Sequence, residues 1–184
     1  MKELQVQLAW NRLLAIVEEQ AQVLMRTAFS TVVREAGDLS AGVFDVRGEM
    51  LAQAVTGTPG HVNSMAEAVK KFLAKYPASK LEPGDVLLTN DPWDGTGHLN
   101  DFTVVTPVFL SSEIIGFFAS TSHIADVGGR GFGPDANDLF EEGLRVPISY
   151  LLQKGEPNQT LMDLIKANVR DPLVAEGDLY SLIA

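Results

Sequence analysis

The chain has 184 residues, of which 46% are hydrophobic and 21% are charged, so we expect a domain with a buried core rather than a disordered chain or a disulfide-stabilised mini-protein. Its 14 basic and 24 acidic residues give a formal net charge of −10, which opposes binding to nucleic-acid phosphates and to anionic lipids. The absence of cysteine excludes thiolate metal ligands, disulfides and a cysteine nucleophile. Any metal must therefore be held by histidines and carboxylates.

The N-terminus has no cationic segment followed by an apolar one, and no apolar run reaches the roughly 18 residues of a membrane span. We therefore predict a cytoplasmic protein without a nucleic-acid or membrane partner. No repeat, low-complexity segment or linker divides the sequence, so residues 1–184 are predicted to form a single domain.

The first predicted element is a long amphipathic helix from Leu4 to about Arg34, where apolar residues recur at three- and four-residue spacing without Gly or Pro. Gly37 and Asp38 end this helix. Residues 41–46 and 50–55 then have the pattern of two strands joined by a Gly-containing turn, which predicts a hairpin.

A second helix is predicted from the spacing of Ser64 and Glu67, which is that of a capping box, and it runs to about Tyr76. The preceding segment has loop composition. His61 is therefore expected just ahead of a helix N-terminus, where it is either a loop hydrogen-bond partner or an acid or base.

The next elements are a strand at residues 86–89, a long loop of turn-forming residues, and two strands at residues 102–109 and 114–121. The last two are separated by only four residues and form the clearest predicted hairpin. Pro107 indicates a free edge or a bulge in its strand, because proline cannot donate a ladder hydrogen bond.

The C-terminal part begins with a Gly-rich loop at residues 128–133 and a short helical stretch near residues 137–143. Helices are predicted at about residues 160–169 and from Pro172 onward. The fold class is therefore α+β, in which an antiparallel sheet built from hairpins packs with the long N-terminal helix and further helices.

Two of the three histidines lie at the open ends of the clearest hairpin. If its turn is centred between residues 111 and 112, facing residues have numbers that sum to about 223, and His123 lies opposite Asn100. Asp101 and His98 are then close to His123, because facing Cβ atoms are about 5 Å apart and diagonal ones about 7–8 Å. His98 and Asp101 would point to opposite faces of a straight strand, so the turn at Gly97 must curl the backbone.

Two imidazoles and one carboxylate suit Mn²⁺, Fe²⁺ or Zn²⁺ and leave coordination positions for water or substrate. Such a metal would polarise a carbonyl or lower the pKa of bound water. The alternative is that His98 and His123 make ordinary hydrogen bonds at strand ends. A non-haem iron oxygenase is a further reading, since its site has the same ligand types.

Three further residues are candidate catalytic groups, namely His61, Asp91 and Asp126. Asp91 could contact substrate or orient a metal ligand, or its Asn-Asp-Pro turn could use the side chain to satisfy its own backbone. Asp126 follows His123 by three residues and could orient a ligand or act as a base. The Gly-rich loop at residues 128–133 could present N–H groups to an oxyanion, but it is not a phosphate-binding P-loop, because no Gly-Lys-Ser/Thr follows.

Several separated motifs together resemble the hydantoinase B/oxoprolinase family, and the resemblance runs from about Arg34 to the end. They are Thr58-Pro-Gly-His-Val-Asn-Ser-Met65, Pro83-Gly-Asp-Val86, Asn90-Asp-Pro-Trp93, Thr96-Gly-His-Leu-Asn-Asp-Phe-Thr103, Ser122-His-Ile-Ala-Asp-Val-Gly-Gly129 and Glu141-Glu-Gly-Leu-Arg145. In the ketone carboxylases of this family, a single Mn ion is held by His-x-x-Asp and a second His 22 residues later. The resemblance thus implies a metal held by His98, Asp101 and His123.

The resemblance also implies a partner subunit of the hydantoinase A type that uses ATP to activate a small cyclic amide or ketone. The expected function is ATP-dependent ring opening of a lactam or hydantoin, and carboxylation of a ketone with bicarbonate is the alternative. Family subunits run to several hundred residues, so this chain is expected to be the N-terminal part of a larger subunit. A companion chain could supply the remainder, or the chain could be a non-catalytic assembly module.

Overall fold

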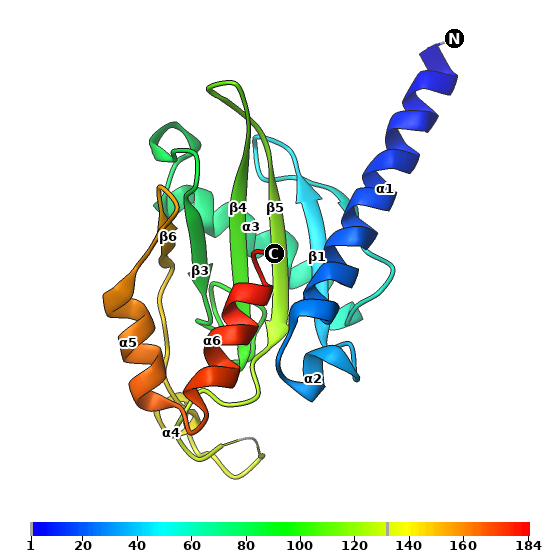
Figure 1. The fold of residues 1–184 in the computed structure, drawn as a ribbon. Helices are drawn as coiled ribbons and strands as arrows, with labels where there is room; N and C mark the ends of the chain where they lie inside the picture. Colours follow the sequence, from blue (N-terminus) through cyan, green and yellow to red (C-terminus); the bar gives the residue numbers. More distant parts are fainter. Residues whose placement is uncertain (1, 132) are drawn as a thin grey trace.

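A computed structural model describes residues 2–131 and 133–184, and within them one seven-stranded antiparallel sheet lies between helices (Figure 1). The strand order is β2-β1-β5-β4-β3-β6-β7. The strands are β1 (Leu39–Phe44), β2 (Met50–Gln53), β3 (Val86–Thr89), β4 (Asp101–Leu110), β5 (Glu113–His123), β6 (Ser149–Gln153) and β7 (Glu156–Pro157). The helices are α1 (Lys2–Thr27), α2 (Thr31–Arg34), α3 (Pro59–Lys75), α4 (Leu139–Glu142), α5 (Gln159–Asn168) and α6 (Pro172–Ser181), with a 3₁₀ turn at Ala78–Lys80. The predicted α+β class is confirmed.

Side chains that alternate along the central strands build a separate core on each face of the sheet. Val105 and Phe117 point to the face covered by α3, where they pack with Met65 and Phe72. Phe102 and its alternate neighbours point to the other face, in the core that α1, α5 and α6 share with the sheet. Figure 1 shows α1 and α6 in front of the sheet and α3 behind it. The sheet is therefore the middle layer of three.

The predicted single N-terminal helix is wrong at its C-terminal end, because α1 stops at Thr27 and a separate short helix begins at Thr31. The backbone N–H groups of Phe29 and Ser30 donate to Oδ1 of Asp178 at 2.7 and 3.0 Å. These tertiary bonds replace the helical bonds that an unbroken helix would make. Nothing in the local sequence indicates this break, since the acceptor lies almost 150 residues away.

The predicted capping box at Ser64 is also wrong, because α3 begins at Pro59 with Thr58 as its N-cap residue. Proline is favoured at the first helical position, since its missing N–H needs no partner there and its φ is already helical. The Ser64 hydroxyl donates to the carbonyls of Gly60 and His61 within the helix. His61 thus lies in the first turn of α3 rather than ahead of it.

The predicted hairpin of β4 and β5 is confirmed, but its register differs by one residue at the open end. Next to the turn, Leu110 faces Glu113, whereas beyond a bulge at Val108 and Phe109 the pairing shifts, and His123 faces Asp101 instead of Asn100. The bulge adds one residue to one strand, so every residue beyond it faces a partner one position further along the other strand. Pro107 lies next to the bulge, as predicted, and beyond the 103–105 segment that β3 pairs with.

Strands β6 and β7 occupy a segment for which the sequence pattern gave no assignment, and β6 pairs with β3. Within residues 2–131 and 133–184, no helix has both the length and the apolar character needed to cross a membrane.

Asp178 is predicted to be a major stabilising contact between α6 and the break after α1. Asp178→Ala removes the acceptor of the buried Ser30 N–H and of the partly buried Phe29 N–H, so we expect the free energy of unfolding to fall by about 2–4 kcal/mol. Asp171→Ala on the same helix removes only an exposed N-cap bond to Val174 and should cost about 1 kcal/mol. Urea unfolding of both variants tests this order, and equal losses would contradict it.

Candidate metal centre

Three neighbouring strands bring acidic and histidine side chains together at one end of the sheet. Asp101 and His123 face each other across β4 and β5. The backbone N–H of His123 donates to the carbonyl of Asp38, the residue before β1, at 3.1 Å. Because paired residues point to the same face, these positions form a row on the α3 side of the sheet.

Asp101 is the centre of this cluster and is itself buried. Its Oδ1 lies 3.1 Å from Nδ1 of His123 and 3.7 Å from Nδ1 of His98, and its Oδ2 lies 3.1 Å from Nε2 of His61. One ligating atom each from His98, Asp101 and His123 lies within 4.8 Å of the other two. The structure therefore brings together the three residues predicted as metal ligands and adds His61 beside them.

The turn before β4 brings His98 to the cluster. Gly97 has a φ of +93°, which is the left-handed region where a residue without Cβ is favoured. The N–H of Asp101 donates to the carbonyl of His98 at 3.1 Å, and the Thr96 hydroxyl donates to Oδ2 of Asp101 at the same distance. The predicted curl of the backbone at Gly97 is confirmed, and it leaves the His98 side chain 42% exposed, in contrast to the buried His123.

Burial raises the pKa of Asp101, since a carboxylate loses hydration in the protein interior. Hydrogen bonds from His123 and His61, together with the charges of these imidazoles, outweigh burial and hold the pKa well below its usual range. Asp101 is therefore an ionised carboxylate that is poor in water and surrounded by nitrogen atoms. This is the electrostatic setting in which a cation is attracted.

Asp38 is the site residue that sequence reasoning missed, since it was assigned only to the end of the first helix. Its Oδ1 accepts a 2.6 Å hydrogen bond from the Thr58 hydroxyl and lies 3.8 Å from Nε2 of His61. Its Oδ2 lies 3.9 Å from Nδ1 of His123. Only the pairing of β1 with β5 brings it there, and no local motif indicates that pairing.

The donor set fits a divalent cation. Two imidazoles and one carboxylate converge from a strand pair and a turn, and the exposure of His98 leaves one side open to solvent. His61 and Asp38 surround these donors as hydrogen-bonding neighbours, which is how ligand orientation is fixed around metal ions. Among the described residues, Nδ1 of His61 is buried without a hydrogen-bond partner.

The structure places Asp91 apart from this cluster. Its Oδ1 accepts a hydrogen bond from the N–H of Trp93, and its Oδ2 lies 3.7 Å from Nε of Arg145. The neighbouring Asn90 side chain is fully buried and bonds to the backbone of Leu99, Leu144 and Val146, so it joins two loops. A catalytic role for Asp91 stays a prediction.

Asp126 is likewise held by groups outside the cluster. Its carboxylate accepts hydrogen bonds from the N–H of Gly128, from the N–H of Arg170 and from the Arg170 guanidinium. These contacts fasten the start of the Gly-rich loop to the segment between α5 and α6. Phe132, within that loop, lies outside the described residues.

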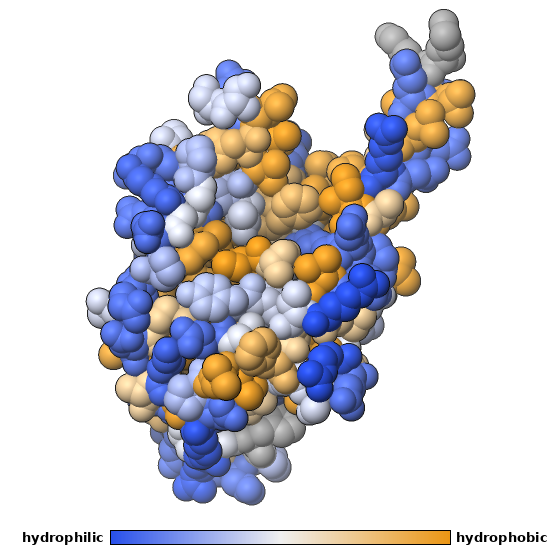
Figure 2. Space-filling model, in the orientation of Figure 1, coloured by the Kyte–Doolittle hydropathy of each residue, from blue (hydrophilic) through white to orange (hydrophobic). Residues whose placement is uncertain are grey.

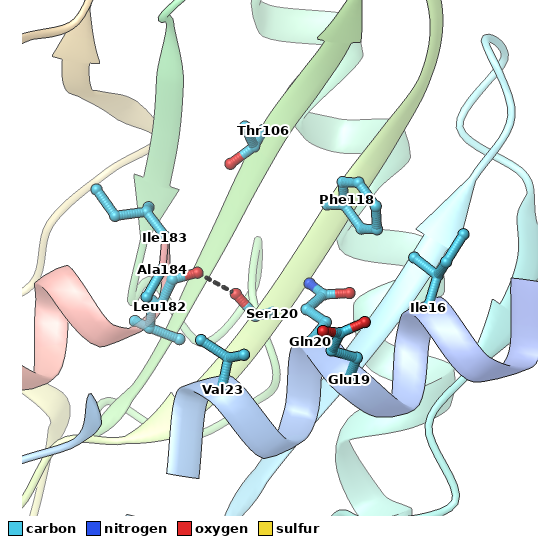
Figure 3. A pocket seen from close by; sticks show the side chains of 10 residues that line it. All are labelled: Ile16, Glu19, Gln20, Val23, Thr106, Phe118, Ser120, Leu182, Ile183 and Ala184. Atoms are coloured by element: carbon cyan, nitrogen blue, oxygen red, sulfur yellow. Dashed lines mark hydrogen bonds between the residues drawn. The ribbon is translucent and has the colours of Figure 1, made fainter. Parts of the chain in front are cut away.

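An apolar hollow on the opposite face of the sheet is separate from the candidate metal centre. Figure 2 shows apolar surface gathered between α1 and the neighbouring strands. The hollow has a volume of about 290 Å³, and Figure 3 shows Ile16 and Phe118 on one side and the C-terminal residues on the other. The Ser120 hydroxyl donates to the carbonyl of Leu182 across it at 2.6 Å. Ser120 points away from the α3 face. None of the residues that line this hollow belongs to the cluster of His98, Asp101 and His123.

Asp126 is predicted to stabilise the fold in a pH-dependent way. Burial raises the pKa of Asp126. The hydrogen bonds from Arg170 and Gly128 and the charge of Arg170 lower it by more than burial raises it, so the pKa in the folded state lies below that in the unfolded state. The stabilisation is then complete above pH ~4 and is lost as the pH falls through the folded pKa. Asp126→Asn should lower the unfolding free energy by about 1 kcal/mol at pH 7, after solvent screening, and by progressively less below pH ~4. Urea unfolding of wild type and variant at pH 7 and at pH 3 tests this, and an equal loss of unfolding free energy at the two pH values would contradict it.

Comparison with known proteins places the chain in a family. The model of the hydantoinase B/oxoprolinase family matches residues 2–184. An uncharacterised protein of Methanocaldococcus jannaschii is 38% identical over 174 residues, which are 92% of this chain and 31% of that protein. The 5-oxoprolinase of Saccharomyces cerevisiae is 37% identical over 88% of this chain and 13% of its own length. The caprolactamase subunit beta of Pseudomonas jessenii is 32% identical over 88% of this chain and 28% of its own length.

Solved structures agree with this result. The crystal structure of the ATP-dependent caprolactamase of Pseudomonas jessenii superposes with a TM-score of 0.84 at 30% identity, over 97% of this chain and 31% of that chain. An acetone carboxylase structure has the same TM-score at 23% identity, over 96% of this chain and 24% of that one, and shows the shared fold. The chain spans about a third or less of the length of these relatives. It belongs to the hydantoinase B/oxoprolinase family.

Proposed function

We propose that this chain is the metal-binding unit of an ATP-dependent enzyme that opens the ring of a cyclic amide. One observation carries the proposal, namely the convergence of His98, Asp101 and His123 on a space that a single cation can fill. Their donor types favour Mn²⁺, Fe²⁺ or Zn²⁺ over Mg²⁺ or Ca²⁺, which prefer oxygen ligands.

A bound divalent cation supplies Lewis-acid polarisation of a carbonyl, or a water molecule with a lowered pKa. The residues of this chain provide the frame for that chemistry. Asp101 brings the negative charge, and His61 holds one of its oxygens so that the other faces His98 and His123. Asp38 and Thr58 fix the far side of the same cluster. The arginine contacts of Asp91 and Asp126 favour structural roles for these two carboxylates.

The names of the relatives support a cyclic amide as the substrate. Those above 30% identity include proteins named 5-oxoprolinase and caprolactamase, and both names refer to ring amides. Ring opening is therefore favoured over ketone carboxylation, for which the acetone carboxylase likeness supports only the fold. The caprolactamase is described as ATP-dependent, and the present sequence has no P-loop. We therefore propose that a partner subunit of the hydantoinase A type uses the ATP, and that the activity belongs to an assembly larger than this chain.

Metal content is the direct test of the proposal. Protein purified without a chelator should carry close to one Mn, Fe or Zn ion per chain by elemental analysis. His98→Ala combined with His123→Ala should lose it, because only one strong ligand then remains. Asp94→Asn is a matched carboxylate control at an exposed ion pair with Lys71 and should retain the ion.

Two results would contradict the metal proposal. One is retention of the ion by the double histidine variant while its circular dichroism is native. The other is absence of metal from the wild-type chain after reconstitution with each of the three ions.

Asp38 is predicted to orient the ligands without binding the ion. Asp38→Asn keeps an acceptor for the Thr58 hydroxyl but removes the charge beside His61 and His123, so we expect metal affinity to fall by about 10-fold. Asp45→Asn, in the exposed turn between β1 and β2, should leave the affinity unchanged. Competition with a metal-binding dye measures both. A loss of 1000-fold or more would instead make Asp38 a direct ligand.

A further inference from the structure

A cavity of about 300 Å³ adjoins the candidate metal centre on its exposed side. His98, the most exposed of the three donors, lines it, and so does Asn100, two residues further along the chain. Gly131, Gly133, Pro134 and Glu142 form the rest of its described wall. The volume is at the lower limit for small-molecule sites and suits a ligand of about one ring.

Close backbone packing builds the far wall of this cavity. A Cβ atom on Gly129 would overlap the backbone of Glu142, and one on Gly143 would overlap the carbonyl of Val127. The two segments are joined by hydrogen bonds from Leu144 N–H to the Val127 carbonyl at 2.7 Å and from Arg130 N–H to the Glu141 carbonyl at 2.9 Å. The glycines thus bring the 141–144 segment against the 127–131 segment, so that Glu142 is held at the cavity.

The two adjacent glutamates differ in what their carboxylates contact. Glu141 is occupied, since its carboxylate pairs with Arg130 at 3.0 Å and accepts two bonds from Asn137. Within residues 2–131 and 133–184, no hydrogen bond or ion pair holds the carboxylate of Glu142. Asn100 is 7% exposed, and its Nδ2 donates to the carbonyl of Ile124 at 2.9 Å, which leaves its Oδ1 as an acceptor. The side chains of the cavity wall thus offer acceptors for a ligand that donates N–H.

We propose that this cavity binds the substrate ring and that the Glu142 carboxylate accepts a hydrogen bond from the ring N–H. This inference rests on the proposed function, because it places a cyclic amide beside the metal ligands. In a small ring the amide is cis, so its C=O and N–H lie on the same edge, whereas an open-chain amide is trans and presents them on opposite sides. A ring amide can therefore turn its carbonyl toward His98 while its N–H meets an acceptor of the same cavity. The site would select cyclic amides over linear ones.

Calorimetric titration with hydantoin tests the role of Glu142 directly. Metal-loaded wild-type protein should bind hydantoin more tightly than 1,3-dimethylhydantoin, which lacks both N–H groups, and more tightly than the open-chain N-acetylglycine N-methylamide, whose two amides are secondary and trans. Glu142→Leu should weaken hydantoin binding by about 10-fold or more, the effect of losing one hydrogen bond to a charged acceptor. Glu142→Gln, which keeps an acceptor oxygen, should recover part of that loss. Glu141→Leu is the matched control and should leave hydantoin affinity unchanged.

The outcomes separate this inference from the proposed function. Unchanged hydantoin affinity in Glu142→Leu, or no measurable binding by the metal-loaded wild type, overturns the role of Glu142 while metal content still supports the metal site. Equal weakening by Glu141→Leu also overturns it, because the effect is then one of loop folding. Loss of metal from Glu142→Leu would contradict it as well, since Glu142 would then act through the ion.

Discussion

The pairing of β5 with both β1 and β4 is the constraint on which the rest of this structure depends. It sets Asp38, His123 and Asp101 side by side at one end of the sheet, although they lie far apart in the sequence. A buried carboxylate is costly unless hydrogen bonds and charges compensate for lost hydration, and two imidazoles provide that compensation for Asp101. The same arrangement that lets the carboxylate be buried also collects nitrogen and oxygen donors around one space. Burial of this carboxylate and the geometry of the candidate metal centre therefore have a common origin at this point.

The alternation of side chains along β4 and β5 gives the two faces of the sheet different surroundings. On the α3 side, Asp101 and His123 continue a column whose inner members are threonines and then apolar residues, so the polar cluster is sealed from below by a packed core. On the other side, the strands face α1 and α6, and the hollow there has apolar residues and Glu19 as the single acidic side chain among its described lining residues. The cluster of Asp38, Asp101 and the histidines thus lies at one end of the α3 face.

Glycine positions connect the candidate metal centre to the cavity beside it. Gly97 turns the chain so that His98 returns to Asp101, and Gly129 and Gly143 allow two loop segments to approach until their backbones touch. Asp126 fastens the beginning of that loop to Arg170. The residues that contact a ligand in our proposal, His98, Asn100 and Glu142, thus come from two loops that are each fixed by contacts elsewhere. Such support keeps polar groups in place without a ligand, as a binding site requires.

The sequence alone determined the fold class, the main hairpin and the three residues that converge at the candidate metal centre, because these depend on local patterns: strand alternation, a short turn and histidines at the hairpin ends. Tertiary structure decided the strand register and the contacts between distant segments, which local sequence patterns do not indicate. The bulge near Pro107 set His123 opposite Asp101, the pairing of β1 with β5 brought Asp38 to the site, and Asp178 ended the first helix from the other end of the chain. Glu141 and Glu142 are indistinguishable as sequence, and only the packing of two glycine-containing loops gave one of them to Arg130 and the other to the cavity. Long-range pairing and close backbone contact are properties of the folded chain, so no local pattern records them.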